Sequence, residues 1–137
     1  MEANELQHGD WIRRRYTQSG REVVIDFQVD QLRRLSIDDN DLYVWGKNGY
    51  RGNVGTVEEM EPIPLTPEIL EKNGFQADGY EILVFETDEY HFTLQKGVDG
   101  INNWWWDMFC SPVIPINYVH ELQHALKLCK IEKEIEL

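Results

Sequence analysis

The residues of this chain that are best suited to chemistry lie together in the stretch His120-Glu121-Leu122-Gln123-His124. The stretch matches the H-E-x-x-H pattern, in which two histidines one helical turn apart hold a zinc ion and the glutamate deprotonates a zinc-bound water. This match is the basis for one hypothesis, a zinc-dependent metallohydrolase with His120 and His124 as metal ligands and Glu121 as the catalytic base.

The sequence after the motif does not supply the third protein ligand that a catalytic zinc requires. Where a common class of these enzymes continues with H-x-x-G-x-x-H, this chain has Lys127 and Lys130 in place of the glycine and the last histidine. On a helical wheel centred on Leu122, His120 and His124 also point away from the apolar stripe. We therefore expect a solvated helix face, no metal or other cofactor, and no enzymatic activity.

A helix from Asn117 onward positions this motif. Pro112 and Pro115 exclude a helix before residue 116, and Asn117 is a good N-cap. Apolar residues then recur at the spacing of one buried stripe, namely Tyr118, Val119, Leu122, Ala125, Leu126 and Cys129. The glutamates after residue 131 are expected on a continuation of this helix or on a frayed tail, and not near the histidines.

Three consecutive tryptophans, Trp104, Trp105 and Trp106, are the candidate binding residues. On a strand, Trp104 and Trp106 share one face and Trp105 takes the other. One face is expected to pack under the C-terminal helix. The opposite face needs cover from the N-terminal lobe, from a second copy in a homodimer or from a stacked ligand.

Short strands separated by turns predict a β-rich lobe over residues 1–64. Strands are expected over residues 10–16, 22–28, 42–45 and 56–63, with turns at 18–20, 38–41 and 47–49. Four or five short strands in so few residues favour a small SH3-like barrel or a curled β meander.

The remainder, residues 65–137, predicts an α-β-β-β-α lobe. Its first helix has Thr66 as N-cap, Pro67 at the first helical position and Gly74 after its last turn. Strands follow over residues 80–85, 90–96 and 103–109, and the helix from Asn117 closes the order. The fold class is therefore α+β, with two lobes or with both lobes in one compact unit.

The net charge of −12 is unevenly spread. Residues 1–57 hold 8 Lys and Arg against 9 Asp and Glu, a net of −1, and residues 58–137 hold 5 against 16, a net of −11. Such an acidic surface repels phosphate, so nucleic-acid binding is disfavoured, and only Arg13, Arg14 and Arg15 offer a weak basic patch. The same acidity supports another hypothesis, an acidic DNA mimic that inhibits a nucleic-acid-binding protein.

Composition and sequence patterns restrict the structural class and the cellular location of the protein. A hydrophobic fraction of 42% in 137 residues fits a globular protein rather than a disordered one. The acidic start has no signal-peptide pattern, no apolar run reaches membrane-spanning length, and Cys110 and Cys129 form no metal or redox spacing. We expect a cytoplasmic protein without a membrane segment and with reduced thiols.

Three motifs of this chain carry a resemblance to a protein family in which similar motifs occur in the same order. They are Leu6 with Gly9-Asp10-Trp11-Ile12, then Glu61-Pro62-Ile63-Pro64-Leu65-Thr66 with Gly74-Phe75, then Tyr118-Val119-His120-Glu121-Leu122-Gln123. The chain resembles an uncharacterised family of small bacterial proteins, often encoded in prophages and other mobile elements. Members of that family read V-H-x-L-Q-N in the last motif. The resemblance therefore implies that Glu121 occupies a variable position and that His124 replaces an asparagine.

Taken together, these patterns favour a non-enzymatic binding module of a mobile element. The module is expected to act through a protein partner or through self-association. The zinc-dependent metallohydrolase and the acidic DNA mimic remain the alternatives.

Overall fold

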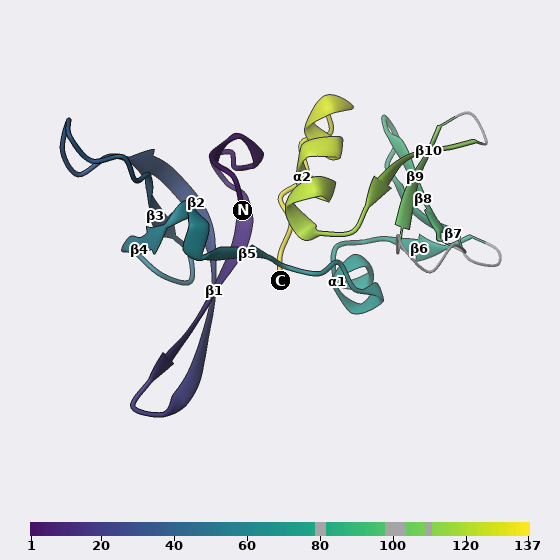
Figure 1. Ribbon diagram of the computed structural model, residues 1–137. Helices are drawn as coiled ribbons and strands as arrows, with labels where there is room; N and C mark the ends of the chain where they lie inside the picture. Colours follow the sequence, from purple (N-terminus) through teal and green to yellow (C-terminus); the bar gives the residue numbers. More distant parts are fainter. Residues whose placement is uncertain (79–81, 98–103, 109–110) are drawn as a thin grey trace. The chain divides into compact units, whose positions relative to one another are not determined.

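A computed structural model describes residues 1–78, 82–97, 104–108 and 111–137 of the chain (Figure 1). These residues form two compact units, Met1–Ile63 and Pro64–Leu137. Each unit holds one five-stranded antiparallel sheet, and the second unit also holds two α-helices. The fold class is therefore α+β, as predicted. Residues 80, 81, 103 and 109 of the predicted strands lie outside the described residues.

Unit 1 is a sheet in the order β4-β3-β2-β1-β5. Its strands are β1 (Trp11–Gln18), β2 (Arg21–Arg33), β3 (Tyr43–Lys47), β4 (Gly52–Thr56) and β5 (Met60–Pro62), and it has two 3₁₀ turns, η1 (Ala3–Glu5) and η2 (Val57–Glu59). Successive strands pair as in a meander, and β5 returns to pair with β1. The sheet is not a closed barrel, because in the described residues β4 and β5 are its two edges.

The β1–β2 hairpin sets the register of this sheet. Ser19 and Gly20 both have positive φ, 52° and 76°, which gives the turn the twist that two antiparallel strands need. The register that follows places Ile12 opposite Phe27, and both side chains are fully buried. The core of unit 1 consists of Leu6, Ile12, Phe27, Val29, Val44, Val54, Val57 and Met60.

The single strand predicted over residues 56–63 is wrong. The chain instead ends β4 at Thr56, makes the η2 turn and begins β5 at Met60. Glu59 causes the break, since its carboxylate accepts the backbone N–H of Thr56 at 3.0 Å and the hydroxyl at 3.1 Å. Arg14 donates to the same carboxylate at 2.8 Å. The turn sends β5 back to β1, where Pro62 lies opposite Ile12.

Unit 2 has five strands where three were predicted, so the expected α-β-β-β-α order is corrected to α-β-β-β-β-β-α. Its elements are α1 (Pro67–Lys72), β6 (Gln76–Ala77), β7 (Ile82–Glu86), β8 (His91–Lys96), β9 (Trp104–Met108), β10 (Ser111–Ile116) and α2 (Val119–Leu128), with strand order β10-β9-β8-β7-β6. The missed strands are the two edges. β6 is very short, and β10 contains Pro112 and Pro115, which only an edge strand tolerates.

Helix α1 begins and ends where its sequence predicts. The hydroxyl of Thr66 accepts the N–H of Ile69 at 3.3 Å, and Pro67 is the first helical residue. At the other end Gly74 has φ +92°, and the N–H of Phe75 donates to the carbonyl of Leu70 at 3.0 Å. This cap turns the chain away from the helix axis and buries Leu70 and Phe75.

The segment after α2 is neither a continued helix nor a frayed tail, so that expectation is also wrong. Lys130 has φ +59° and reverses the chain, and Ile131 and Ile135 are then buried. The buried amide of Asn73 holds this segment. It donates to the Glu136 carbonyl at 2.7 Å and accepts the Glu136 N–H at 2.7 Å. Unit 2 therefore keeps its C-terminal residues against α1.

Candidate functional site

Helix α2 carries the H-E-x-x-H stretch, and Glu121 helps to start this helix. The carboxylate of Glu121 accepts the backbone N–H of Asn117 at 2.9 Å and that of Tyr118 at 3.1 Å. The N-cap is Tyr118, one residue after the predicted Asn117. A glutamate at the third helical position commonly reaches back in this way, because the first N–H groups of a helix have no partner within it. Glu121 is thus occupied as a helix cap.

The two histidines pack rather than extend into solvent. His120 is only 6% exposed and His124 is half-buried, so the prediction of an outward face is wrong for His120. The ring centroids of His120 and His124 are 5.6 Å apart with planes at 81°, and Tyr118 stacks on His120 at 6.1 Å. The helical wheel counted only apolar residues as inward, whereas histidine is intermediate between core and surface and its ring can be buried by stacking on other rings.

A zinc site requires a further ligand next to His120 and His124. Within the part of the chain that the structure describes, no three His, Cys, Asp or Glu side chains come together in a group that could hold a metal ion. Cys129 is a half-buried free thiol near the end of α2, and burial raises its pKa above the ordinary value. Cys110 lies outside the described residues.

An apolar pocket of about 180 Å³ lies between α2 and the strands β9 and β10. It brings Trp106 together with Glu121 and His124 of the H-E-x-x-H stretch, which the sequence analysis had treated separately from the tryptophans. It also contains residues that the sequence analysis missed, namely Ile114, Pro115, Ile116, Ala125 and Leu128. The missed strand explains the omission, because without β10 there was no second wall. Two apolar side chains of this pocket are open to solvent, Ile114 at 41% and Leu128 at 74% exposure.

The three tryptophans divide as strand alternation requires. Trp104 and Trp106 are buried on one face of β9, and Trp106 stacks on Phe92 at 5.3 Å between ring centroids. Trp105 is half-buried on the other face, opposite Gln95 of β8. Of the three candidate binding residues, Trp106 is the one that lines the apolar pocket.

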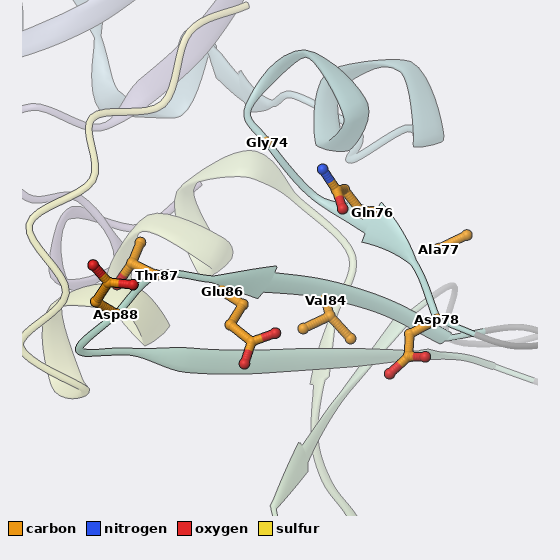
Figure 2. Close-up of a pocket in the computed structure, with 8 residues that line it drawn as sticks. All are labelled: Gly74, Gln76, Ala77, Asp78, Val84, Glu86, Thr87 and Asp88. Carbon is orange, nitrogen blue, oxygen red and sulfur yellow. The ribbon is translucent and has the colours of Figure 1, made fainter.

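A second hollow of unit 2 is acidic and lies at the β6 edge of its sheet, where Figure 2 shows its lining. We call it the acidic cleft. Its volume is about 520 Å³, and its lining consists of Gly74, Gln76, Ala77, Asp78, Val84, Glu86, Thr87 and Asp88. Three of these eight residues carry a carboxylate and none is basic. Sequence reasoning missed the cleft, because the strand β6 that bounds it has only two residues.

The Arg13–Arg15 run does not form an open basic patch. Arg13 donates two hydrogen bonds to Asp26, at 2.7 and 3.1 Å. These hydrogen bonds raise the pKa of Arg13 above its ordinary value. Arg14 pairs with Glu59, and Arg15 pairs with Glu22 and Glu61. Each charge of the Arg13–Arg15 run therefore faces a carboxylate.

Comparison of the chain with protein-family models, with curated proteins and with solved structures gives no match. Among the residues that the structure describes, neither helix has the length and apolar character needed to cross a membrane.

Proposed function

We propose that this protein is a non-enzymatic interaction module that binds a protein partner through the apolar pocket between α2 and β10. One observation carries the proposal, the pocket itself, with Ile114 and Leu128 exposed beside it. Burying such side chains against a partner releases ordered water and is the main favourable contribution in most protein associations.

The size of the pocket supports a side chain as its occupant. Pockets for substrates or cofactors hold about 300–1,000 Å³, whereas this one holds about 180 Å³. One leucine, isoleucine or phenylalanine side chain fills such a space. At many protein interfaces a few side chains buried in well-packed pockets supply most of the binding energy.

The edge strand β10 favours docking by side chains over strand pairing. Pro112 and Pro115 have no backbone N–H, so the outer edge of β10 cannot offer a continuous ladder to another strand. Charge then distinguishes the two possible partners, a second copy of this chain and a different protein. Residues 58–137 carry a net charge of −11, which opposes a second copy of the same surface. A different protein with a neutral or basic surface is therefore the proposed occupant.

Site-specific photocrosslinking tests this proposal. A photoreactive phenylalanine analogue in place of Leu128 is expected to give a discrete adduct with another protein in cells. Adding Ile114→Asp, which places a charge at the pocket, should abolish that adduct. The matched control carries the same probe in place of Leu35, an exposed leucine of unit 1. An adduct that survives Ile114→Asp, or one that forms equally from position 35, contradicts the proposal.

The zinc-dependent metallohydrolase stays as a second candidate, since His120, His124 and Glu121 share one helix end and two of them line the pocket. We expect the purified protein to contain no stoichiometric zinc, because the described residues bring no third ligand to the histidines. Elemental analysis measures this. About one tightly held zinc per chain that is lost in both His120→Ala and His124→Ala would replace the interaction module with the hydrolase.

We further propose that unit 1 is an open SH3-like sheet and that the chain belongs to a mobile element. The order β4-β3-β2-β1-β5, with the η2 turn between β4 and β5, supports the first statement. The motif resemblance supports the second. A cytoplasmic location is consistent with both.

A further inference from the structure

The acidic cleft lies where the sheet of unit 2 has an open strand edge. Only Gln76 and Ala77 of β6 pair with β7, opposite Val84 and Leu83. The register would next place Gly74 opposite Glu86, but the N–H of Gly74 donates to the Glu71 carbonyl in the C-terminal cap of α1. In the described residues, β6 therefore ends before Glu86, and β7 has no strand partner on this side at that residue. The helix cap that ends α1 thus creates the open edge.

The backbone of Glu86 faces this edge. The N–H of Asp78 donates to the Ile82 carbonyl at 3.0 Å, which shows that Ile82 directs its backbone groups toward the β6 side. In an antiparallel strand the backbone groups of every second residue face the same neighbour. Val84 and Glu86 therefore face that side too, and Val84 is already opposite Gln76. At Glu86 the edge is open to one more segment of extended chain.

The side chains around this edge define the charge of such a segment. Figure 2 shows Val84 and Glu86 on the same side of β7, with Asp78 near the β6 end of the cleft and Asp88 at the turn that follows β7. These three carboxylates, with no Lys or Arg in the lining, repel an acidic strand and attract a basic one. His91 lies 3.5 Å from Glu86, but both side chains are largely exposed, so this pair is easily replaced.

We propose that the acidic cleft binds an extended protein segment that adds to β7 as an edge strand and carries Lys or Arg at alternate positions. Main-chain hydrogen bonds to Glu86 hold the segment, and its basic side chains lie against Glu86 and its neighbouring carboxylates. Strand alternation accounts for the spacing, because every second side chain points to the same face. The cleft lies at the β6 edge of the sheet and the apolar pocket lies at the β10 edge. A negative binding result at one site therefore does not contradict the proposal for the other site.

A synthetic peptide of alternating valine and lysine provides the test, with the full-length protein observed by NMR. Addition of the peptide is expected to shift the amide signals of Glu86, Thr87 and Gly74. The double variant Glu86→Lys with Asp88→Lys should weaken binding by about tenfold or more. The matched control, Asp38→Lys with Glu58→Lys, changes the net charge equally at exposed residues of unit 1 and should leave the affinity within about twofold.

Two further peptides separate strand addition from simple charge attraction. N-methylation of the peptide at alternate residues removes the hydrogen bonds of one strand edge. One N-methylated register should lose binding, and the other register should retain it. Equal binding of both registers, equal competition by spermine, or no shift at Glu86 and Thr87 would each overturn the proposal.

Discussion

At the scale of single residues, the same side chain can match a catalytic motif and still serve the fold. Glu121 stands where H-E-x-x-H requires a base, yet its carboxylate accepts the N–H groups of Asn117 and Tyr118 at the start of α2. The first N–H groups of a helix have no acceptor within the helix, so they attract a carboxylate whether or not a metal is nearby. The local backbone therefore accounts for the glutamate without any catalytic role.

Replacement of Glu121 tests this role. Glu121→Ala should lower the free energy of unfolding by about 0.5–2 kcal/mol, the usual cost of losing a helix cap. Glu121→Gln keeps an acceptor oxygen and should cost less than about 0.5 kcal/mol. Denaturant unfolding measures both, with Glu132→Ala as the exposed control. An unchanged stability of Glu121→Ala would contradict the capping role, and a hydrolytic activity lost in Glu121→Gln would assign the base instead.

The hydrogen bonds of Glu59 predict that the stability of unit 1 depends on pH. Its pKa is lowered by the backbone N–H of Thr56, then by the Thr56 hydroxyl and by Arg14. A lowered pKa means that the folded state favours the carboxylate, so its contribution to stability is complete above the unfolded pKa of about 4.3 and is lost as the pH falls through the folded value. The stability difference between the wild type and Glu59→Gln should therefore shrink at acidic pH. A difference that is constant from pH 6 to pH 3 would contradict this.

At the scale of elements, the ends of the helices α1 and α2 determine where the neighbouring segments of unit 2 run. The C-terminal cap of α1 engages the N–H of Gly74 and leaves β7 open at Glu86. The residue before Gly74, Asn73, holds the chain after α2 through the backbone of Glu136. One short helix therefore determines both the edge of the sheet and the course of the C-terminal segment.

Asn73→Ala should be strongly destabilising, although Asn73 is polar. Asn73 is 1% exposed and its amide also donates to the Ile69 carbonyl at 2.8 Å, so its loss removes the side-chain partner of the part-buried N–H and carbonyl of Glu136. Each such group costs about 1–3 kcal/mol. Urea unfolding should show a lower midpoint at an unchanged slope, together with faster amide exchange at Glu136. The exposed Asn40→Ala is the control, and equal midpoints for both variants would show that Asn73 does not hold the segment.

At the scale of the whole molecule, the charge is negative in total, and the arginines of the Arg13–Arg15 run are paired with carboxylates. The net charge is −12, and Arg13, Arg14 and Arg15 each contact a carboxylate. A phosphate would have to displace those carboxylates before it could bind. The whole-molecule charge therefore favours basic and neutral proteins as partners over nucleic acids.

We expect no binding to duplex DNA even at low salt. Fluorescence anisotropy of a labelled duplex at about 50 mM salt, where phosphate contacts are strong, gives a sensitive measurement. Binding that weakens in Arg14→Ala and falls steeply as salt is raised would show that the arginine run is available after all. The same titration with a basic peptide in place of DNA provides the positive control for an acidic surface.

Local sequence signals determined those parts of the fold that depend on near neighbours. The helix from Pro67, the β1–β2 hairpin and the alternation of the three tryptophans follow from caps, turn residues and strand periodicity, all of which act within a few residues. The α+β class follows from them. The candidate residues Trp106, Glu121 and His124 were also found by residue type alone.

Tertiary structure decided what depends on contacts between distant residues. Pro112 and Pro115 disfavour a strand in the sequence, but they are tolerated in β10 because β10 is an edge of the sheet. The two residues of β6 form a strand only because β7 lies beside them. The burial of His120 and the hold of Asn73 on Glu136 likewise depend on neighbours outside any local pattern. A sequence window contains no information on these long-range contacts, and both the apolar pocket and the acidic cleft are made from them.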